Sequence, residues 1–259
     1  MLVSTLLDRL QSDPGRPRLT WYGDDGERIE LSGAVLANWV AKTTNLLVEE
    51  YDAQPGSMVG VNLPVHWRTV TWALATWRVG ATVVLLGDSG APELDVVVTD
   101  SPERWTASPA ELVVVSLPAL ARRYDGDLPS GATDAAAAVM TYADQVIYAP
   151  EPEPGRVALT GVRGGPTGPG GARTGEGADG SPPAAAVRHG ELVPEPAGET
   201  GRVLVDGRAN AAEVLRGVLR VWAGGGSVVL TSPATAAALE ADTARRDRLV
   251  TTEKIETIA

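Results

Sequence analysis

The sequence contains no cysteine and no phenylalanine, and only two histidines. The lack of cysteine excludes disulfide bonds, thiolate metal sites and a cysteine nucleophile. Because His66 and His189 are the only histidines, a histidine-rich zinc site is not expected either. Only Lys42 and Lys254 are lysines, so 20 of the 22 basic residues are arginines. This usage, together with the missing phenylalanine, indicates coding in a GC-rich genome and carries no functional signal.

Long apolar runs are also missing. A membrane-spanning helix needs about 18 consecutive apolar residues, and Arg78 interrupts the best candidate. The N-terminal residues lack a basic start and reach Asp8 early, which is unlike a signal peptide. The formal net charge of -11 and the pI near 4.7 argue against nucleic acids and anionic membranes as partners. We therefore expect a cytoplasmic protein that binds neither nucleic acid nor membrane.

The length of 259 residues suits one large domain or two small ones, and a chain of this size buries roughly 75% of its unfolded surface. We expect an α/β lobe at residues 1–150. Residues 151–200 are dense in glycine and proline and nearly free of large apolar residues, so we expect a loop or linker there, with 163–183 as its most mobile part. Residues 201–259 indicate a second α/β segment, packed with the first into one compact unit.

Residues 55–86 carry the clearest structural pattern. An apolar run at 58–63 without alternation predicts a strand that is covered on both faces. Helical spacing of apolar residues on two faces then predicts a buried helix at 66–79, followed by a glycine stop and a strand at 82–86. Strands that alternate with helices in this way favour a parallel sheet with helical crossovers.

Apolar periodicity and β-branched runs predict the remaining elements. We expect helices at 3–10, 36–47, 134–147, 215–222 and 235–249, and strands at 18–22, 28–31, 95–99, 112–115, 203–205 and 227–230, with a short extended run at 250–252. Residues 70–86 and 214–230 share the order helix, glycine, strand. This similarity indicates either the common unit of any α/β protein or two related lobes.

Several of these segments resemble a known family. Residues 55–64 resemble the strand motif GDxVxxxLPN, residues 80–86 the GA-plus-strand motif, and residues 30–36 the TYxEL-like helix start. These motifs belong to the adenylate-forming enzymes, which include acyl-CoA synthetases, luciferases and peptide-synthetase adenylation domains. The resemblance covers residues 18–100 well and 201–252 moderately. It implies an α/β fold with mainly parallel sheets flanked by helices, like the N-terminal region of that family.

The family's phosphate-binding loop, TSGTTGxPKG, has only a degenerate counterpart. The best match lies at residues 175–184 and is followed by residues 188–192, which resemble the THxNL helix; a second register at 160–168 fits no better. The hydroxyls are lost and Pro183 stands in the place of the lysine. Glu176 and Asp179 put carboxylates where phosphate would sit, and two like charges ~4 Å apart repel by roughly 4 kcal/mol. The candidate residues for this degenerate site are Gly175, Gly177, Gly180, Ser181, Pro182, Arg188 and His189.

Other residues have alternative interpretations. His66 is either a ligand or catalytic group or, as we favour, a surface or helix-capping residue. His189 next to Arg188 is either an anion-binding residue at a helix N-terminus or an ordinary part of the loop. The remaining candidates are Trp67, Trp72 and Trp77, for which we favour core packing over an acyl pocket, and Asp88, Asp95 and Asp100, for which we favour loop solvation over ligand binding at strand ends.

The resemblance and the degenerate loop together predict a catalytically inactive homologue of acyl-CoA synthetases that acts as a binding, scaffold or regulatory protein. Family members also carry an adenine motif, a ribose-binding aspartate and an adenylation lysine in later residues. No catalytic residue, metal site or cofactor is expected. The alternative is a residual AMP-binding, ligase-like or acyl-binding activity, in which case ATP or AMP and Mg²⁺ would bind and a partner subunit could supply missing parts. A third interpretation is a structural interaction module. We expect a homodimer.

Overall fold

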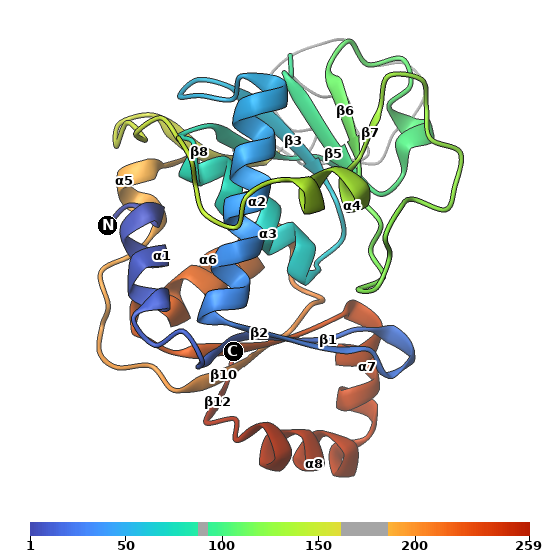
Figure 1. Ribbon diagram of the computed structural model, residues 1–259. Coiled ribbons are helices and arrows are strands. Elements are labelled where there is room, and N and C mark those ends of the chain that lie inside the picture. Colours follow the sequence, from blue (N-terminus) through green and yellow to red (C-terminus); the bar gives the residue numbers. More distant parts are fainter. Residues whose placement is uncertain (88–92, 162–185) are drawn as a thin grey trace, which may run out of the picture.

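Two mainly parallel β-sheets, with helices between them, form the architecture of the protein (Figure 1). The structure is a computed structural model that describes residues 1–87, 93–161 and 186–259. The helices between the sheets are α1 (Val3–Gln11), α2 (Gly33–Tyr51), α3 (Trp67–Arg78) and α6 (Ala211–Ala223). Two further helices, α7 (Pro233–Ala241) and α8 (Thr243–Glu253), lie on the other face of the smaller sheet. The predicted fold class is confirmed.

The larger sheet has seven strands in the order β7-β6-β5-β3-β4-β8-β9. Its parallel centre consists of β3 (Met58–Asn62), β4 (Thr82–Leu85), β5 (Val96–Thr99) and β6 (Glu111–Val114), as the apolar runs predict. A short strand, β7 (Thr133–Asp134), adds to the β6 edge. Helix α3 connects β3 to β4, and Trp72 on it is only 4% exposed, which confirms the predicted burial of this helix.

The segment at 151–200, in which little regular structure was expected, contains three short elements among its described residues. Strand β8 (Val157–Gly161) pairs in parallel with β4, and β9 (Val187–Arg188) pairs antiparallel with β8 before the short helix α5 (His189–Leu192). Five residues are enough for this strand because β4 offers a free edge, and Ala158 and Leu159 are buried against it. Residues 162–185, which include most of the segment predicted to be mobile, lie outside the described residues.

The smaller sheet has five strands in the order β12-β10-β11-β1-β2. It joins the N-terminal hairpin, β1 (Pro17–Tyr22) and β2 (Arg28–Ser32), to β10 (Arg202–Val205), β11 (Ser227–Thr231) and β12 (Thr257–Ile258). Strand β1 pairs in parallel with β11, so residues from both ends of the chain share one sheet. Sheet membership therefore does not follow the boundaries expected at 150 and 200, and the division into folding units stays a prediction.

The two similar segments of the sequence make the same local structure in the two sheets. Helix α3 ends before Gly80 and leads into β4, while α6 ends before Gly225 and leads into β11. Both glycines have φ of +77°, a left-handed conformation that favours glycine. Each following strand lies between the strand that precedes its helix and a strand from a distant part of the chain. The sequence similarity thus corresponds to two equivalent β–α–β units, one in each sheet.

The predicted helix at 134–147 is wrong beyond its first turns. Helix α4 covers only Ala135–Ala138, a 3-10 turn follows at Val139–Thr141, and the chain then becomes irregular. Asn45 on α2 explains the difference, because its amide group donates to the carbonyls of Ala143 and Gln145 and accepts from the N–H of Ile147. These tertiary hydrogen bonds hold the backbone in a conformation that the local alanine-rich sequence does not favour.

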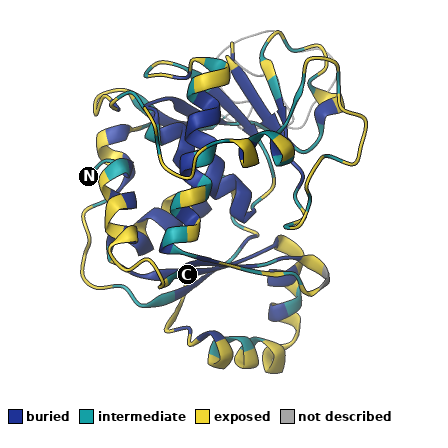
Figure 2. Ribbon diagram, viewed as in Figure 1, coloured by how far each residue is buried: buried dark blue, intermediate teal, exposed yellow. Residues whose placement is uncertain are grey.

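The C-terminal helical region is also divided differently from the prediction. A single helix was expected at 235–249, but α7 ends at Ala241 and α8 begins at Thr243. Asp242 between them caps α8, since its carboxylate accepts from the N–H of Arg245. The run at 250–252 belongs to α8, and the last strand is β12. Burial is concentrated in the strands and central helices, while α8 is mostly exposed (Figure 2).

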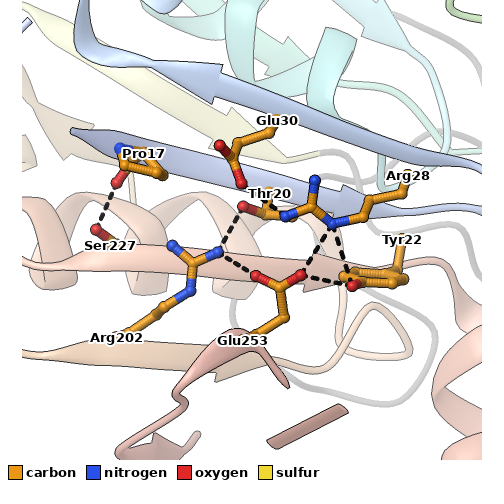
Figure 3. Close-up of polar contacts among 8 residues, drawn as sticks. All are labelled: Pro17, Thr20, Tyr22, Arg28, Glu30, Arg202, Ser227 and Glu253. Atoms are coloured by element: carbon orange, nitrogen blue, oxygen red, sulfur yellow. Dashed lines mark hydrogen bonds and ion pairs between the residues drawn. The ribbon is translucent and has the colours of Figure 1, made fainter. Parts of the chain in front are cut away.

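Glu253, at the end of α8, is the exception to this exposure. Its side chain is 5% exposed and lies over the smaller sheet between Arg28 on β2 and Arg202 on β10 (Figure 3). One carboxylate oxygen accepts from Arg28 at 2.9 Å and from the Tyr22 hydroxyl at 2.6 Å, and the other accepts from Arg202 at 2.5 Å. Burial alone would raise the pKa of Glu253, but these hydrogen bonds lower it to about 2. The cluster fixes α8 on the sheet.

Among the helices of the described segments, none combines the length and the apolar character that a membrane crossing needs.

Candidate functional site

The carboxyl ends of strands from both sheets meet at one cleft. In the larger sheet β4 and β5 lie on opposite sides of β3, so the strand order reverses at β3. Open α/β sheets bind ligands outside the carboxyl ends of the strands at such a reversal. Residues 64–66 follow β3 and line a cleft of about 380 Å³. The facing wall comes from the smaller sheet, with Trp21 on β1 and Ser232 after β11.

His66 lines this cleft and caps helix α3. Its Nδ1 accepts from the backbone N–H of Arg68 at 3.1 Å, and the residue is 5% exposed. Burial is the main cause, and the nearby charge of Arg68 a smaller one, that lowers the pKa of His66 to about 3. The imidazole is therefore neutral near pH 7, and because Nδ1 accepts, its proton lies on Nε2. The predicted capping role is confirmed, although the side chain is buried and does not lie on the surface.

The free edge of the His66 ring faces an aromatic neighbour and the cleft. Nε2 makes no hydrogen bond to any residue that the structure describes. The indole ring of Trp21 packs edge-on against the imidazole, with ring centroids 4.6 Å apart. The cleft thus offers one neutral N–H donor beside an aromatic surface. It suits a ligand with a hydrogen-bond acceptor, and a histidine with this pKa supplies little general-base catalysis at neutral pH.

Two carboxylates complete the polar lining of the cleft. Glu27 accepts from the indole N–H of Trp21 at 3.1 Å and from the backbone N–H of Ala119 at 3.1 Å. Asp24 accepts from the hydroxyl of Ser232 at 2.5 Å. No arginine or lysine is among the described residues that line the cleft. The lining itself therefore carries two carboxylates, while the guanidinium of Arg68 lies close to both His66 and Glu27.

The aspartates predicted at strand ends have different positions. Asp100 follows β5 and lines a separate hollow of about 450 Å³ with Arg123 and Tyr124, and burial raises the pKa of its carboxyl group. Asp95 lies before β5, at the opposite edge of the sheet, and accepts from the N–H of Met58 at 2.7 Å. Asp88 lies outside the described residues. Of the two aspartates that the structure describes, Asp100 faces a space that a ligand could enter and Asp95 does not.

The degenerate phosphate loop lies mainly outside the described residues, which omit Gly175, Gly177, Gly180, Ser181 and Pro182. Arg188 is described and donates to the carbonyl of Gly155. His189 is 2% exposed, its Nε2 lies 3.0 Å from the carbonyl oxygen of Gly80, and burial lowers its pKa. Gly80 precedes β4, so His189 lies at the amino-terminal edge of the strands, opposite the cleft.

The tryptophans of α3 pack in the core. Trp67, Trp72 and Trp77 are between 0% and 4% exposed and belong to one large apolar cluster. The space that Trp67 and Trp72 line with their neighbours has a volume of about 10 Å³. This is the size of a single water site and too small for an acyl chain.

Sequence reasoning missed Trp21, Glu27 and Ser232, which only the meeting of distant segments brings to one cleft. The hairpin that carries Glu27 gave no chemical signal, because a carboxylate at a turn is ordinarily solvated. Within the described segments, no three histidine or acidic side chains gather in an arrangement that could hold a metal ion.

Comparisons with known proteins agree with the fold. No protein-family model matches the chain. A TIGR03089 family protein of Mycobacterium tuberculosis (strain ATCC 25618 / H37Rv) is 42% identical over 168 residues, which are 60% of this chain and 65% of that protein. The chain thus matches less than two thirds of the length of this relative, whose name states no activity.

Two solved structures share the architecture. An acyl-CoA synthetase of Brucella canis matches with a TM-score of 0.65 and 16% identity, over 90% of this chain and 43% of that protein. A variant of the amide bond synthetase Mcba from Marinactinospora thermotolerans matches with a TM-score of 0.62 and 16% identity, over 99% of this chain and 48% of that protein. The protein therefore has the fold of acyl-CoA synthetases and related adenylate-forming enzymes, over less than half the length of either solved structure.

Proposed function

We propose that this protein is a catalytically inactive counterpart of acyl-CoA synthetases that acts as a binding, scaffold or regulatory protein. The observation that carries the proposal is the substitution of the phosphate-binding loop. Glu176 and Asp179 stand where phosphate would bind, and Pro183 replaces the lysine. A loop that holds a polyphosphate uses backbone N–H groups, hydroxyls and a cation, and this one has lost two of the three.

The cleft between the two sheets supports the same proposal. Its two carboxylates, on Asp24 and Glu27, disfavour a triphosphate, and His66 offers a neutral N–H donor and little basicity. These groups fit an uncharged or cationic ligand with a hydrogen-bond acceptor next to its apolar face. The cleft therefore suits binding without adenylate chemistry. The proposal includes no catalytic residue, no metal and no cofactor.

A thermal-shift screen of the purified protein tests this function. The ligands are ATP with Mg²⁺, AMP, CoA and a series of acyl-CoAs, each at millimolar concentration. A ligand at 100 times its dissociation constant stabilises the native state by about 2.7 kcal/mol, which such a screen detects readily. We expect no stabilisation by ATP or AMP. A shift with ATP that requires Mg²⁺ would support the residual ligase-like activity, and a shift with acyl-CoA alone would support acyl binding; either result would overturn the proposal.

Self-association and location are further parts of the proposal. Large apolar side chains are exposed at Ile147 and Tyr148, which are neighbours in the chain and offer a surface for a second copy. We therefore propose a homodimer, and from the composition we propose that it is located in the cytoplasm. Light scattering at high protein concentration that shows only the monomer would refute the dimer, and cell fractionation tests the location.

A further inference from the structure

Arg68, in the first turn of α3, is a buried cation with an incomplete set of partners. The residue is 6% exposed. Its Nε donates to the carbonyl of Leu117 at 3.3 Å, and its Nη2 donates to the carbonyls of Pro118 and Ala119 at 3.1 and 3.4 Å. An arginine has five N–H donors, so the two on Nη1 are left without a partner among the described residues.

The charge of Arg68 has no directly bonded counter-charge. Among the described residues no carboxylate forms an ion pair with it. Glu27 is close enough to raise its pKa slightly, and the rings of Trp67 and Trp39 have their centroids 4.4 and 5.4 Å from the guanidinium carbon. Burial lowers the pKa of Arg68 to about 10, so the group stays charged at neutral pH. A buried charge without a directly bonded counter-charge is costly, and an anion from outside the chain that binds the guanidinium directly would relieve that cost.

The surroundings of Arg68 leave room for such an anion. Arg68 lines a hollow of about 480 Å³ between α2, α4 and the segment at 119–122. Arg122 adds a second positive charge, and none of the described lining residues is acidic. On a chain with a formal net charge of -11, this hollow is a local positive site. Leu120, which is 92% exposed, and Met140, which is 59% exposed, form apolar parts of its rim.

We propose that this hollow binds a segment of a partner protein in which an aspartate or glutamate lies between apolar residues. The carboxylate would pair with Nη1 of Arg68, and the flanking apolar side chains would pack on Leu120 and Met140. The exposed apolar rim favours a peptide over a free small acid, since a small acid inside the hollow would leave both side chains in water. Arginine, tryptophan and methionine are also enriched at protein interfaces.

Matched peptides test the proposal. The probes are seven-residue peptides, blocked at both ends, with a central Glu or Asp flanked on each side by Leu, Ile, Met or Val, and their Gln or Asn counterparts. Binding is followed by the NMR signal of the Arg68 Nε–H group and by tryptophan fluorescence. At least one acidic peptide should bind, and at least tenfold more tightly than its amide counterpart, a difference of about 1.4 kcal/mol. Equal binding of both, or no binding below about 1 mM, would overturn the proposal.

Variants localise the binding. Leu120→Ser and Arg122→Gln change exposed side chains and should weaken binding of the acidic peptide about threefold to tenfold without lowering the melting temperature. Arg216→Gln, on the exposed face of α6, is the control and should have no effect. Binding that both rim variants leave unchanged, or equally tight binding of free butyrate, would contradict docking of a peptide. Peptide binding at this hollow does not depend on whether the protein binds or hydrolyses ATP. A negative result with the peptides would therefore leave the proposed inactivity untouched, and a positive result with ATP would leave peptide docking untouched.

Discussion

Trp77 and Trp222 occupy equivalent positions in the two sheets. Each lies in the last turn of its helix and donates its indole N–H to a backbone carbonyl of the strand next to its β–α–β unit. Trp77 donates to Ala158 on β8 at 2.7 Å, and Trp222 donates to Arg18 on β1 at 2.9 Å. Both side chains are almost fully buried. The same hydrogen bond thus fastens β8 in one sheet and β1 in the other.

Replacing either tryptophan by phenylalanine should therefore destabilise the protein to a similar degree. Trp77→Phe and Trp222→Phe each remove a buried hydrogen bond and some packed volume, and we expect a loss of about 2–3 kcal/mol in the free energy of unfolding. Denaturant unfolding measures this loss. Trp67→Phe is the matched control, because the indole N–H of Trp67 is buried and has no partner among the described residues. It should cost about 1–2 kcal/mol less, and three equal losses would contradict this interpretation.

The carboxylate of Glu253 should contribute strongly to stability at neutral pH. Glu253→Gln removes the carboxylate that Arg28 and Arg202 share; Arg28 keeps its pair with Glu30, but Arg202 loses its counter-charge, and we expect a loss of about 2–4 kcal/mol. Glu240→Gln is the control, since the side chain of Glu240 is 69% exposed in its pair with Arg208 and should change stability by less than about 0.5 kcal/mol. Similar losses in both variants would show that the buried cluster over the smaller sheet contributes no more to the free energy of unfolding than an exposed ion pair does.

The same carboxylate gives a pH dependence with a definite sign. The pKa of Glu253 is about 2 in the folded protein and about 4.5 ordinarily, so the unfolded state binds the additional proton between these values. The stabilisation is complete above pH 4.5 and is lost as the pH falls toward 2. Melting temperatures of the wild type and of Glu253→Gln should converge over this range. A difference that stays constant down to pH 2 would contradict the lowered pKa.

His66 should act at higher pH and in the same direction. Its pKa is about 3 in the folded protein and 6.5 ordinarily, so protonation of the unfolded state destabilises the protein as the pH falls from 6.5 toward 3, by at most about 1.4 kcal/mol per pH unit. His66→Asn removes this contribution and keeps a helix cap. The melting temperature of this variant should depend less on pH between 6.5 and 4.5 than that of the wild type. An unchanged slope would show that His66 does not stay neutral.

The capping role of His66 can be separated from its packing. His66→Leu and His66→Asn introduce side chains with the same number of heavy atoms and a similar shape, but only asparagine can accept from the N–H groups at the start of α3. We expect the leucine variant to be less stable than the asparagine variant by about 1 kcal/mol in chemical unfolding at pH 7. Equal stability would mean that the bond from the Arg68 N–H to Nδ1 contributes nothing.

The fold was predictable where local pattern and tertiary environment agree. The segment at 55–86 has strands covered on both faces and a helix that is apolar on two sides, and both properties follow from the residues themselves. The segment at 134–147 was not predictable, because Asn45, about 100 positions earlier, supplies the hydrogen bonds that unwind it. Strand β8 was missed because five residues in a glycine- and proline-rich region become a strand only when β4 provides an edge.

The candidate site was less predictable than the fold. Capping by His66 could be read from its place after Pro64 at a helix start, but its neutral state depends on burial and on Arg68. The partners Trp21 and Glu27 come from a hairpin that belongs to the other sheet. The packing of the two sheets brings these residues together. It depends on the order of strands from distant parts of the chain, which local sequence patterns do not predict.

ATP–pyrophosphate exchange tests the central claim most directly. The protein is assayed with ATP, Mg²⁺ and a panel of carboxylic acids, alongside the variant Pro183→Lys. Losing one preorganised electrostatic contact costs ~3–4 kcal/mol of transition-state stabilisation, and this loop has lost its hydroxyls and its lysine and gained two carboxylates. The account predicts no exchange by the wild type, and none by the variant, because one added charge leaves Glu176 and Asp179 in place. Exchange by the wild type that persists after contaminating enzymes have been excluded would contradict it.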